Sequence, residues 1–387
     1  LIDAGMNVAR INFSHGTHEQ HKQTIDHLKE ARKEKGVPLA IMLDTKGPEI
    51  RAVAVHGGEI ELNKSEKYTL QPDHQLPKNE REISIYPDLV IDQLEEGMVV
   101  LFDDGKIETV VVEKKRNSAV IECVTSGSLK NQKGVNIPHG NISLPHITDK
   151  DKEDIRFGCE QDVDIIAASF VCDAQHVLDI KRLIAEHNQP NIHIMSKIES
   201  FSGVQNFESI VHVSDGIMVA RGDLGVEMPI EQVPKLQKEF ILKCYQVGKP
   251  VAIATQMLES MMHSPTPTRA EVSDVANAIY DSASCVMLSG ETAVGKYPIL
   301  TVQTMRRVID ESEKEFKYRD YFFHQLRKNF YDVPSAVSAA TVKTCYSAAA
   351  KGIIICTMKG MTARSISRFR PSLPILALTP SLKTYNQ

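Results

Sequence analysis

The sequence lacks the features that mark a membrane protein or a nucleic-acid-binding protein. No apolar run approaches the roughly 20 residues that a membrane-spanning helix needs. The formal net charge is −5, and no basic stripe is present that could neutralise the phosphates of a nucleic acid. No low-complexity tract interrupts a composition of 42% apolar and 25% charged residues. We therefore expect a soluble globular protein whose partners include neither a membrane nor a nucleic acid.

Clusters of metal-binding cysteine and histidine are also missing. The seven cysteines are scattered, and the fourteen histidines form no His-x-x-His or His-Glu-x-x-His pattern, so we predict no zinc site. Scattered cysteines are typical of free thiols in a reducing compartment, which predicts a cytoplasmic protein. Because no Walker-type glycine-rich loop is present, any phosphate group would have to be bound by cationic side chains.

The chain is long enough for two or three domains, since 387 residues exceed one ordinary hydrophobic core. Residue 1 is a leucine, and residues 1–5 resemble the last turn of a helix that ends at Gly5. The sequence stops soon after a predicted strand. We therefore expect a chain that is truncated at both ends.

Short apolar runs alternate with amphipathic segments and predict an α/β domain with parallel strands. Seven buried strands are expected at 7–13, 39–43, 164–169, 192–195, 216–220, 250–254 and 285–288. Helices are expected at 18–35, 151–159, 174–187, 230–247, from the capping box of Thr268 and Glu271 to 281, and at 299–315. Polar residues follow nearly every strand. An open doubly wound sheet would concentrate them at one switch point, so the pattern favours a (β/α)8 TIM barrel whose first strand is missing from this chain.

Two further regions differ from this rhythm. Between 52 and 145 the strands are short and separated by turn signals, which predicts an inserted all-β domain that could act as a lid. Residues 318–387 predict a partial C-terminal α/β domain, with helices at 335–349 and 362–369 and strands at 352–356 and 374–378. The catalytic barrel is therefore expected to comprise 1–51 and 146–317.

The side chains that follow the strands suggest phosphate chemistry. Glu199 and Asp223 are suited to Mg²⁺ or Mn²⁺, because hard divalent ions prefer carboxylate oxygens. Cations for phosphate are available in Arg10, Arg51 and Lys197, and oxygens for a monovalent cation in Asn12, Ser14, Asp44 and Thr45. Metal-assisted phosphoryl transfer is the reaction class that this set indicates. The alternative is a structural ion-pair network at the mouth of a barrel.

These residues lie in stretches where the chain resembles the pyruvate kinases, and its bacterial members most closely. The stretches are 7–16 (NVARINFSHG), 43–51 (LDTKGPEIR), 133–138 (KGVNIP), 196–199 (SKIE), 218–227 (MVARGDLGVE), 254–262 (ATQMLESMM), 267–279 (PTRAEVSDVANAI) and 287–293 (MLSGETA). They follow the family's order over nearly the whole chain. The resemblance implies the last ATP-forming step of glycolysis, in which phosphoenolpyruvate and ADP give pyruvate and ATP.

The resemblance also implies a role for each matched residue. Catalytic roles fall to Lys197, Arg10 and Thr255, and substrate binding to Arg10, Lys197, Gly222, Asp223 and Thr255. The implied nucleotide-binding residues are Asn12, Phe13, Ser14, His15, Arg51 and Lys133. Glu199 and Asp223 are implied ligands of Mg²⁺ (or Mn²⁺), and Asn12, Ser14, Asp44 and Thr45 of K⁺, whose use Glu49 supports. Family members are usually homotetramers that sugar phosphates regulate through the C-terminal domain, so both are expected here.

The chain departs from the family pattern at three places. Ser200 stands where asparagine is common, Cys172 and Asp173 replace a usual Arg-Lys pair, and Lys359 replaces a frequent serine of the C-terminal phosphate loop. The last departure leaves the effector open. Two rival interpretations remain, namely another phosphoenolpyruvate or pyruvate barrel such as a metal-dependent aldolase or lyase, and a scaffold protein or inactive fragment.

Overall fold

Seven parallel strands form the central sheet of the computed structural model, which describes residues 1–140, 142–326 and 332–387. The strands are β1 (Val8–Asn12), β2 (Ala40–Asp44), β12 (Ile165–Ala168), β13 (His193–Ile198), β14 (Gly216–Ala220), β15 (Val251–Ala254) and β16 (Cys285–Val286). Their order in space is their order in the sequence, as a barrel requires. The seven expected strands and the α/β class are confirmed. Closure into eight strands is not shown, because β1 and β16 are not paired within the described residues.

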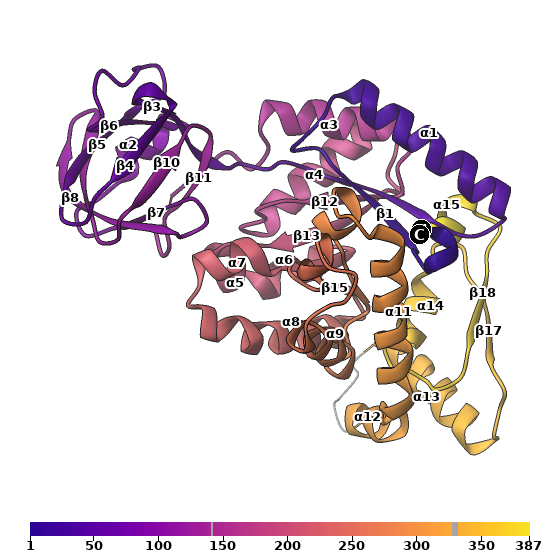
Figure 1. The fold of residues 1–387 in the computed structure, drawn as a ribbon. Coiled ribbons are helices and arrows are strands. Elements are labelled where there is room, and N and C mark those ends of the chain that lie inside the picture. Colours follow the sequence, from indigo (N-terminus) through magenta and orange to yellow (C-terminus); the bar gives the residue numbers. More distant parts are fainter. Residues whose placement is uncertain (141, 327–331) are drawn as a thin grey trace.

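Helices cover the outer face of this sheet (Figure 1). They are α1 (His18–Lys35), α3 (Asp149–Glu160), α4 (Ala174–Glu186), α5 (Phe201–Gln205), α6 (Phe207–Val213), α7 (Arg221–Glu227), α8 (Val233–Val247), α9 (Arg269–Tyr280), α10 (Gly290–Ala293) and α11 (Pro298–Glu315). The expected capping box at the start of α9 is present, with the Thr268 hydroxyl accepting from the Glu271 amide. The helix expected at 230–247 begins at Val233 instead, because residues 230–232 form a separate 3-10 turn.

Both faces of the sheet are buried. Alternate residues such as Ile41 and Leu43 pack against the helices, whereas Ala40 and Met42 belong to a second cluster with Ala167, Met195, Met218 and Ala254. Side chains of successive strand residues point to opposite faces, so β2, β12, β13, β14 and β15 each supply both clusters. This arrangement explains why the strands are continuous apolar runs in the sequence.

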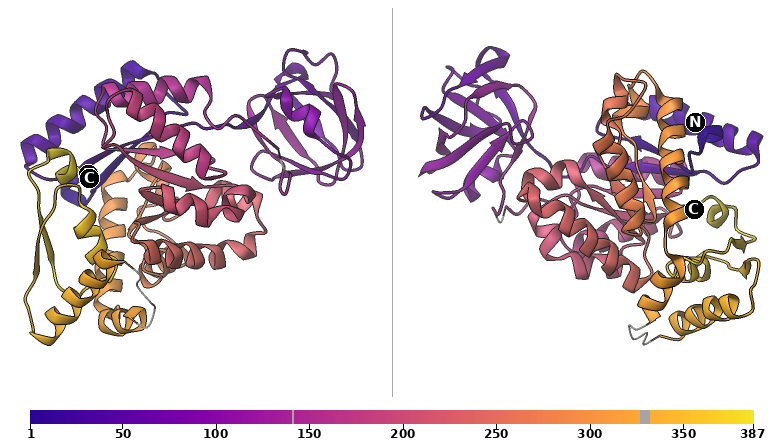
Figure 2. Two further views of the ribbon diagram at one scale, coloured as in Figure 1. Left: turned by 180° about the vertical axis from the view of Figure 1, so that it is seen from behind. Right: turned by 60° about the horizontal axis from the view of Figure 1, so that its bottom comes forward.

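The segment between β2 and α3 forms a closed β-barrel with its own core. Its strands are β3 (Ile50–Val55), β5 (Lys67–Pro72), β6 (Glu82–Tyr86), β7 (Val99–Phe102), β8 (Ile107–Lys115), β9 (Ser118–Cys123) and β11 (Lys133–Asn136), with α2 (Leu89–Gln93) and the pair β4 (Glu59–Leu62) and β10 (Gly127–Lys130). We call this segment the β-domain. Figures 1 and 2 show it projecting from the end of the central sheet. Because β3 begins at Ile50, Arg51 is part of the β-domain.

The C-terminal region packs beside the helices that cover the central sheet (Figure 2). It contains α12 (Tyr318–Leu326), α13 (Val333–Ser347), β17 (Ile353–Cys356), α14 (Met361–Ser367), β18 (Ile375–Leu378) and α15 (Leu382–Asn386). β17 and β18 pair in parallel, as expected for half of a small α/β domain. Residue 141 of the expected segment 52–145, and residues 327–331 of the segment 318–387, lie outside the described residues. No helix in the described part of the chain has the length and apolar character needed to cross a bilayer.

Candidate active site

Lys197 is the centre of a buried cluster at the carboxyl end of the central sheet. Its Nζ lies 3.1 Å from Asp44 Oδ1 and 3.0 Å from Glu199 Oε1. It also donates a 2.7 Å hydrogen bond to Ser169 Oγ. The apolar run ends at residue 195, but β13 continues through Lys197 to Ile198. The strand can accommodate the lysine because three partners satisfy its ammonium group.

The partners of Lys197 keep the cluster charged. Burial alone would lower the pKa of Lys197, but the charges of Asp44 and Glu199 outweigh it and raise this pKa. Burial likewise favours a neutral Asp44, yet Lys197 and Arg10 hold the pKa of that carboxyl below its usual value. Both groups are therefore ionised at neutral pH. Such an arrangement is a fixed set of charges in a site of low dielectric constant.

Arg10 joins the cluster from the neighbouring strand. Its Nε lies 2.5 Å from Asp44 Oδ2, so Asp44 contacts both Arg10 and Lys197. The Arg10 side chain keeps about a fifth of its surface exposed, whereas Asp44 is fully buried. The exposed part of the guanidinium is therefore free to meet an anion that enters the site.

The Ser169 hydroxyl is held in place by a close approach of two loops. It donates to the Thr45 carbonyl oxygen at 2.7 Å, and the Ser169 amide donates to Thr45 Oγ1 at 3.1 Å. Gly47, with φ of 75°, makes this approach possible, because an added Cβ would lie 2.8 Å from the Ser169 Cβ. Ser169 is a site residue that was not predicted from the sequence. Its position at the exit of the third strand was the available signal.

Glu199 is buried and Asp223 is half-buried, and the charges of these two acids repel one another. Burial raises the pKa of Glu199 to about 7, Lys197 opposes the rise, and Asp223 adds to it. The other oxygen of Glu199 accepts a 2.8 Å hydrogen bond from the Phe170 amide. Burial also raises the pKa of Asp223, against Lys197 and reinforced by Glu49. A divalent cation would relieve this repulsion, so the donor set fits Mg²⁺ or Mn²⁺.

The residues expected to bind K⁺ lie at the ends of β1 and β2. Asn12 and Asp44 are direct partners in the register of the two strands. Asn12 Oδ1 accepts from the Ser14 amide at 3.1 Å, so Ser14 is beside them. The Thr45 side chain is turned toward Ser169. The structure thus gathers amide and carboxylate oxygens at one place, which is the type of donor that a hard monovalent cation accepts.

Thr255 lies in strained backbone next to Gly222. Thr255 and Gln256 have φ values of 72° and 53°, a region that non-glycine residues rarely adopt. A Cβ built on Gly222 would lie 3.6 Å from Thr255 Cγ2, so the two residues are neighbours. A hydrogen bond from a neighbouring arginine holds this strained backbone in place. Arg221 Nη2 donates to the Thr255 carbonyl oxygen at 2.7 Å.

Asp274 in turn anchors Arg221. Its two oxygens accept from Nη1 and Nη2 of Arg221 at 2.8 and 2.7 Å, a bidentate pair. The sequence by itself did not identify Asp274 as a partner of this arginine. Asp274 lies on α9, which follows the next strand, so only the packing of α9 brings it to Arg221.

The expected nucleotide-binding residues are spread more widely. Arg51 on β3 and Lys133 on β11 lie on paired strands of the β-domain, where Glu49 and Asp103 neutralise them at 2.5 and 2.7 Å. His15 is exposed beside the end of β1. The Phe13 side chain is only 1% exposed and stacks on His21 with ring centroids 4.0 Å apart. Only the Phe13 backbone can therefore face a ligand.

A cavity of about 200 Å³ lies between the β-domain and the central sheet. Its walls include Arg51 and Asp104 from the β-domain and Phe170, Asp223 and Glu227 from the loops and helices that follow strands of the central sheet. Asn136 Nδ2 donates to Glu227 Oε1 at 2.8 Å and connects the two sides. The cavity thus has Arg51 of the β-domain in one wall and Asp223 in another.

Comparisons with known proteins agree along the whole chain. The family model described as the pyruvate kinase barrel domain matches residues 1–302, and the model of the pyruvate kinase alpha/beta domain matches residues 335–387. Pyruvate kinase of Sporosarcina psychrophila is 46% identical over 98% of this chain and 65% of its own length. Pyruvate kinase of Chlamydia muridarum is 46% identical over the whole chain and 80% of its own length. A solved pyruvate kinase from Cryptosporidium parvum superposes with a TM-score of 0.96 at 42% identity, covering this chain fully and 80% of that chain.

Proposed function

This chain belongs to the pyruvate kinase family, and we propose that it transfers the phosphoryl group of phosphoenolpyruvate to ADP. The observation that carries the proposal is the charged Lys197, buried between Asp44 and Glu199 and beside Arg10. In this reaction the bond between phosphorus and the enol oxygen breaks, and a bond to an oxygen of the ADP β-phosphate forms. The resulting enolate takes up a proton at carbon and becomes pyruvate.

Lys197 and Arg10 stabilise the charge that this transfer spreads over the phosphoryl oxygens. A fixed cation in a dry site does so without reorganising at the moment of reaction. Lys197 also faces the developing enolate. We assign the substrate carboxylate to Gly222, Asp223 and Thr255, with the Thr255 hydroxyl at the face of the enolate that is protonated. The clamp of Arg221 and Asp274 keeps Thr255 in its strained conformation for this role.

Glu199 and Asp223 would hold Mg²⁺ or Mn²⁺, which supplies positive charge for the phosphoryl oxygens when it is bound. Asn12, Ser14, Asp44 and Thr45 would hold K⁺, which supplies a second fixed charge near the nucleotide. We assign the nucleotide to Arg51, Lys133 and the backbone and side chains of 12–15, with the β-domain as the lid over the cavity. A homotetramer and a sugar-phosphate effector bound by the region 318–387 complete the proposal.

A coupled assay tests this function. Lactate dehydrogenase and NADH report pyruvate as it forms from phosphoenolpyruvate, ADP, Mg²⁺ and K⁺. We expect pyruvate formation that depends on both ADP and the divalent cation. Pyruvate formation that is independent of ADP would instead indicate a lyase or a phosphatase.

The monovalent site has its own test in the same assay. Replacing K⁺ with a tetraalkylammonium ion at equal ionic strength should reduce the rate, because that ion is too large for a site of four oxygens. An unchanged rate would refute the assignment of Asn12, Ser14, Asp44 and Thr45.

A further inference from the structure

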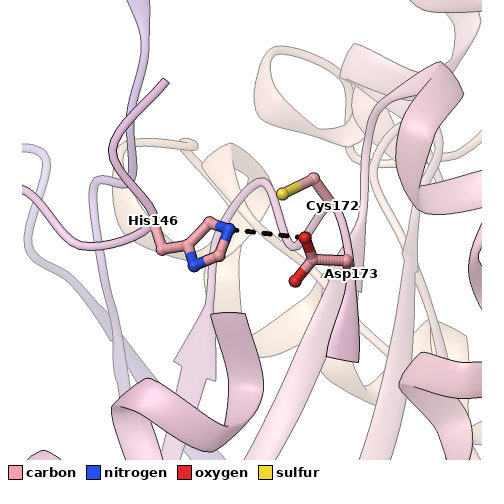
Figure 3. A group of neighbouring side chains, drawn as sticks. All are labelled: His146, Cys172 and Asp173. Atoms are coloured by element: carbon pink, nitrogen blue, oxygen red, sulfur yellow. Dashed lines mark ion pairs between the residues drawn. The ribbon is translucent and has the colours of Figure 1, made fainter. Parts of the chain in front are cut away.

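Three side chains of different chemistry meet at the edge of the interdomain cavity (Figure 3). His146 lies on the segment that returns from the β-domain, and Cys172 and Asp173 lie between β12 and α4. One imidazole nitrogen, one thiol sulfur and one carboxylate oxygen all lie within 4.8 Å of one another. None of these residues belongs to the set assigned to catalysis.

Neighbouring contacts orient the His146 and Asp173 side chains toward each other. His146 Nδ1 donates to Asp179 Oδ2 at 3.1 Å, which leaves Nε2 toward Asp173 Oδ2 at 3.4 Å. The other oxygen of Asp173 accepts from the His176 amide at 2.8 Å and caps α4. In metal-binding histidines, a carboxylate typically accepts a hydrogen bond from the ring nitrogen that does not bind the metal, and this contact fixes the tautomer.

His176 provides an independent observation. It is 3% exposed and lines the same cavity, and its Nδ1 has no hydrogen-bond partner among the described residues. Its ring stacks on His146 with centroids 5.1 Å apart and an interplanar angle of 4°. A buried polar atom normally has a partner, so an unsatisfied imidazole nitrogen at this place indicates a missing ligand.

We propose that His146, Cys172 and Asp173 bind a thiophilic divalent cation of the Zn²⁺ type. The sequence spacing predicted no zinc site, because these three residues meet only in the folded chain. Thiolate and imidazole select Zn²⁺ over Mg²⁺, whereas Glu199 and Asp223 offer only oxygen. Zinc-to-ligand distances are about 2.0–2.3 Å, so binding draws the three groups together. The cysteine loses its proton when it coordinates the ion.

The bound ion would connect the β-domain to the active site. It joins the returning segment at His146 to the loop that carries Phe170, whose amide donates to Glu199. We infer that the ion fixes the lid relative to the barrel and slows turnover. This second step, unlike the binding itself, depends on the proposed function.

Binding is tested directly on the whole chain, after treatment with a chelator and in excess Mg²⁺ to saturate the oxygen site. Equilibrium dialysis should give one tightly bound Zn²⁺ per chain. Co²⁺ should give a thiolate-to-cobalt charge-transfer band in the near ultraviolet. Cys172→Ser and His146→Asn should each remove the band and weaken Zn²⁺ binding at least about 10-fold.

Matched variants separate this site from ordinary surface groups. Asp173→Asn keeps a good helix cap and should still weaken binding. His74→Asn changes the exposed member of the cluster of Asp73, His74 and Asp88, and Cys356→Ser removes an exposed thiol. Both variants should bind Zn²⁺ like the unmodified chain. An unchanged charge-transfer band in Cys172→Ser, or no bound Zn²⁺ in the unmodified chain, would overturn the site.

The inhibitory step has a separate readout. Zn²⁺ should lower the rate of the coupled assay in the unmodified chain and in His74→Asn but not in Cys172→Ser. Equal inhibition in Cys172→Ser would overturn the link to the lid. Because dialysis needs no turnover, a failed metal site and a failed phosphoryl transfer give different results.

Discussion

The charges at the end of the central sheet differ sharply from the charges of the β-domain. The side chains of Lys197, Asp44 and Glu199 are each at most 11% exposed, whereas those of Arg51 and Lys133 are 30% and 39% exposed. Both regions contain ion pairs of about 3 Å or less. Water screens the second set, and such pairs contribute little to stability. The buried charges instead shift the pKa values of one another. A single substitution among them therefore affects both the stability of the fold and the chemistry of the site.

The largest effect is expected for Lys197→Met. It removes the central cation and leaves Asp44 and Glu199 facing each other in a buried site. We expect kcat to fall by at least about 100-fold and the free energy of unfolding to fall by about 3–5 kcal/mol. The coupled assay and urea unfolding measure these two losses. Lys67→Met is the matched control, because its exposed ion pair with Glu122 should be dispensable.

Calorimetry shows whether Lys197→Met still binds phosphoenolpyruvate, which Arg10 should continue to hold. Full activity in a folded Lys197→Met would show that Lys197 has no role in catalysis. The buried cluster would then matter no more for kcat than the surface ion pairs do.

Glu199→Gln tests the buried acid through pH. The pKa of Glu199 is about 7 in the folded chain, against an ordinary value of 4.5. The folded chain therefore holds a proton that the unfolded chain has lost, and stability from this group falls as the pH rises from 4.5 to 7. Without divalent metal, Glu199→Gln should be more stable than the unmodified chain at pH 8, by up to about 3 kcal/mol. The difference should vanish near pH 4.

Urea unfolding with a chelator at several pH values measures this difference. Excess Mg²⁺ should reverse it, because only the unmodified chain gains an ion. If the difference in unfolding free energy between the two chains is the same at pH 4 and pH 8, burial does not raise the pKa of Glu199.

Asp274→Asn should have an intermediate effect. It removes the charged partner of Arg221 and loosens the support of the strained Thr255 backbone. We expect kcat to fall about 10-fold with little change in KM, since Asp274 acts through Arg221 and Thr255 on the transition state. The surface pair of Arg306 and Asp310 provides the control Asp310→Asn. Equal kcat values for the two variants would contradict a positioning role for Asp274.

The smallest effect is expected in the β-domain. Arg51→Ala should raise KM for ADP about 10-fold. This factor corresponds to about 1.4 kcal/mol, which is the expected contribution of one charge-assisted hydrogen bond to ADP. The free energy of unfolding should change by less than about 0.5 kcal/mol, because the pair with Glu49 is only partly buried and water screens it. Lys130→Ala, in an exposed pair with Glu59 of the same domain, should alter neither quantity. If Arg51→Ala lost as much stability as Lys197→Met, the charges of the β-domain would not differ from the buried charges in their effect on folding.

Sequence reasoning succeeded where the signal is local. The capping box of Thr268 and Glu271 is present, because it involves residues three positions apart. The seven strands also lie where their apolar runs predict. The end of a strand is harder to predict from an apolar run. β13 extends through Lys197, whose ammonium group contacts Asp44, Glu199 and Ser169 in the folded chain. The roles assigned to the site residues by resemblance stay predictions.

The amino-acid sequence by itself determined the α/β alternation, the inserted β segment and the polar residues at strand ends, because periodicity and turn residues act over a few positions. Only the tertiary structure decided which of those polar residues share a site. It brought Asp274 to Arg221, and His146 to Cys172 and Asp173, across separations of 53 and 26 positions or more. Distances between such residues are set by packing and by the burial of charge, and neither is encoded in any single stretch of the chain.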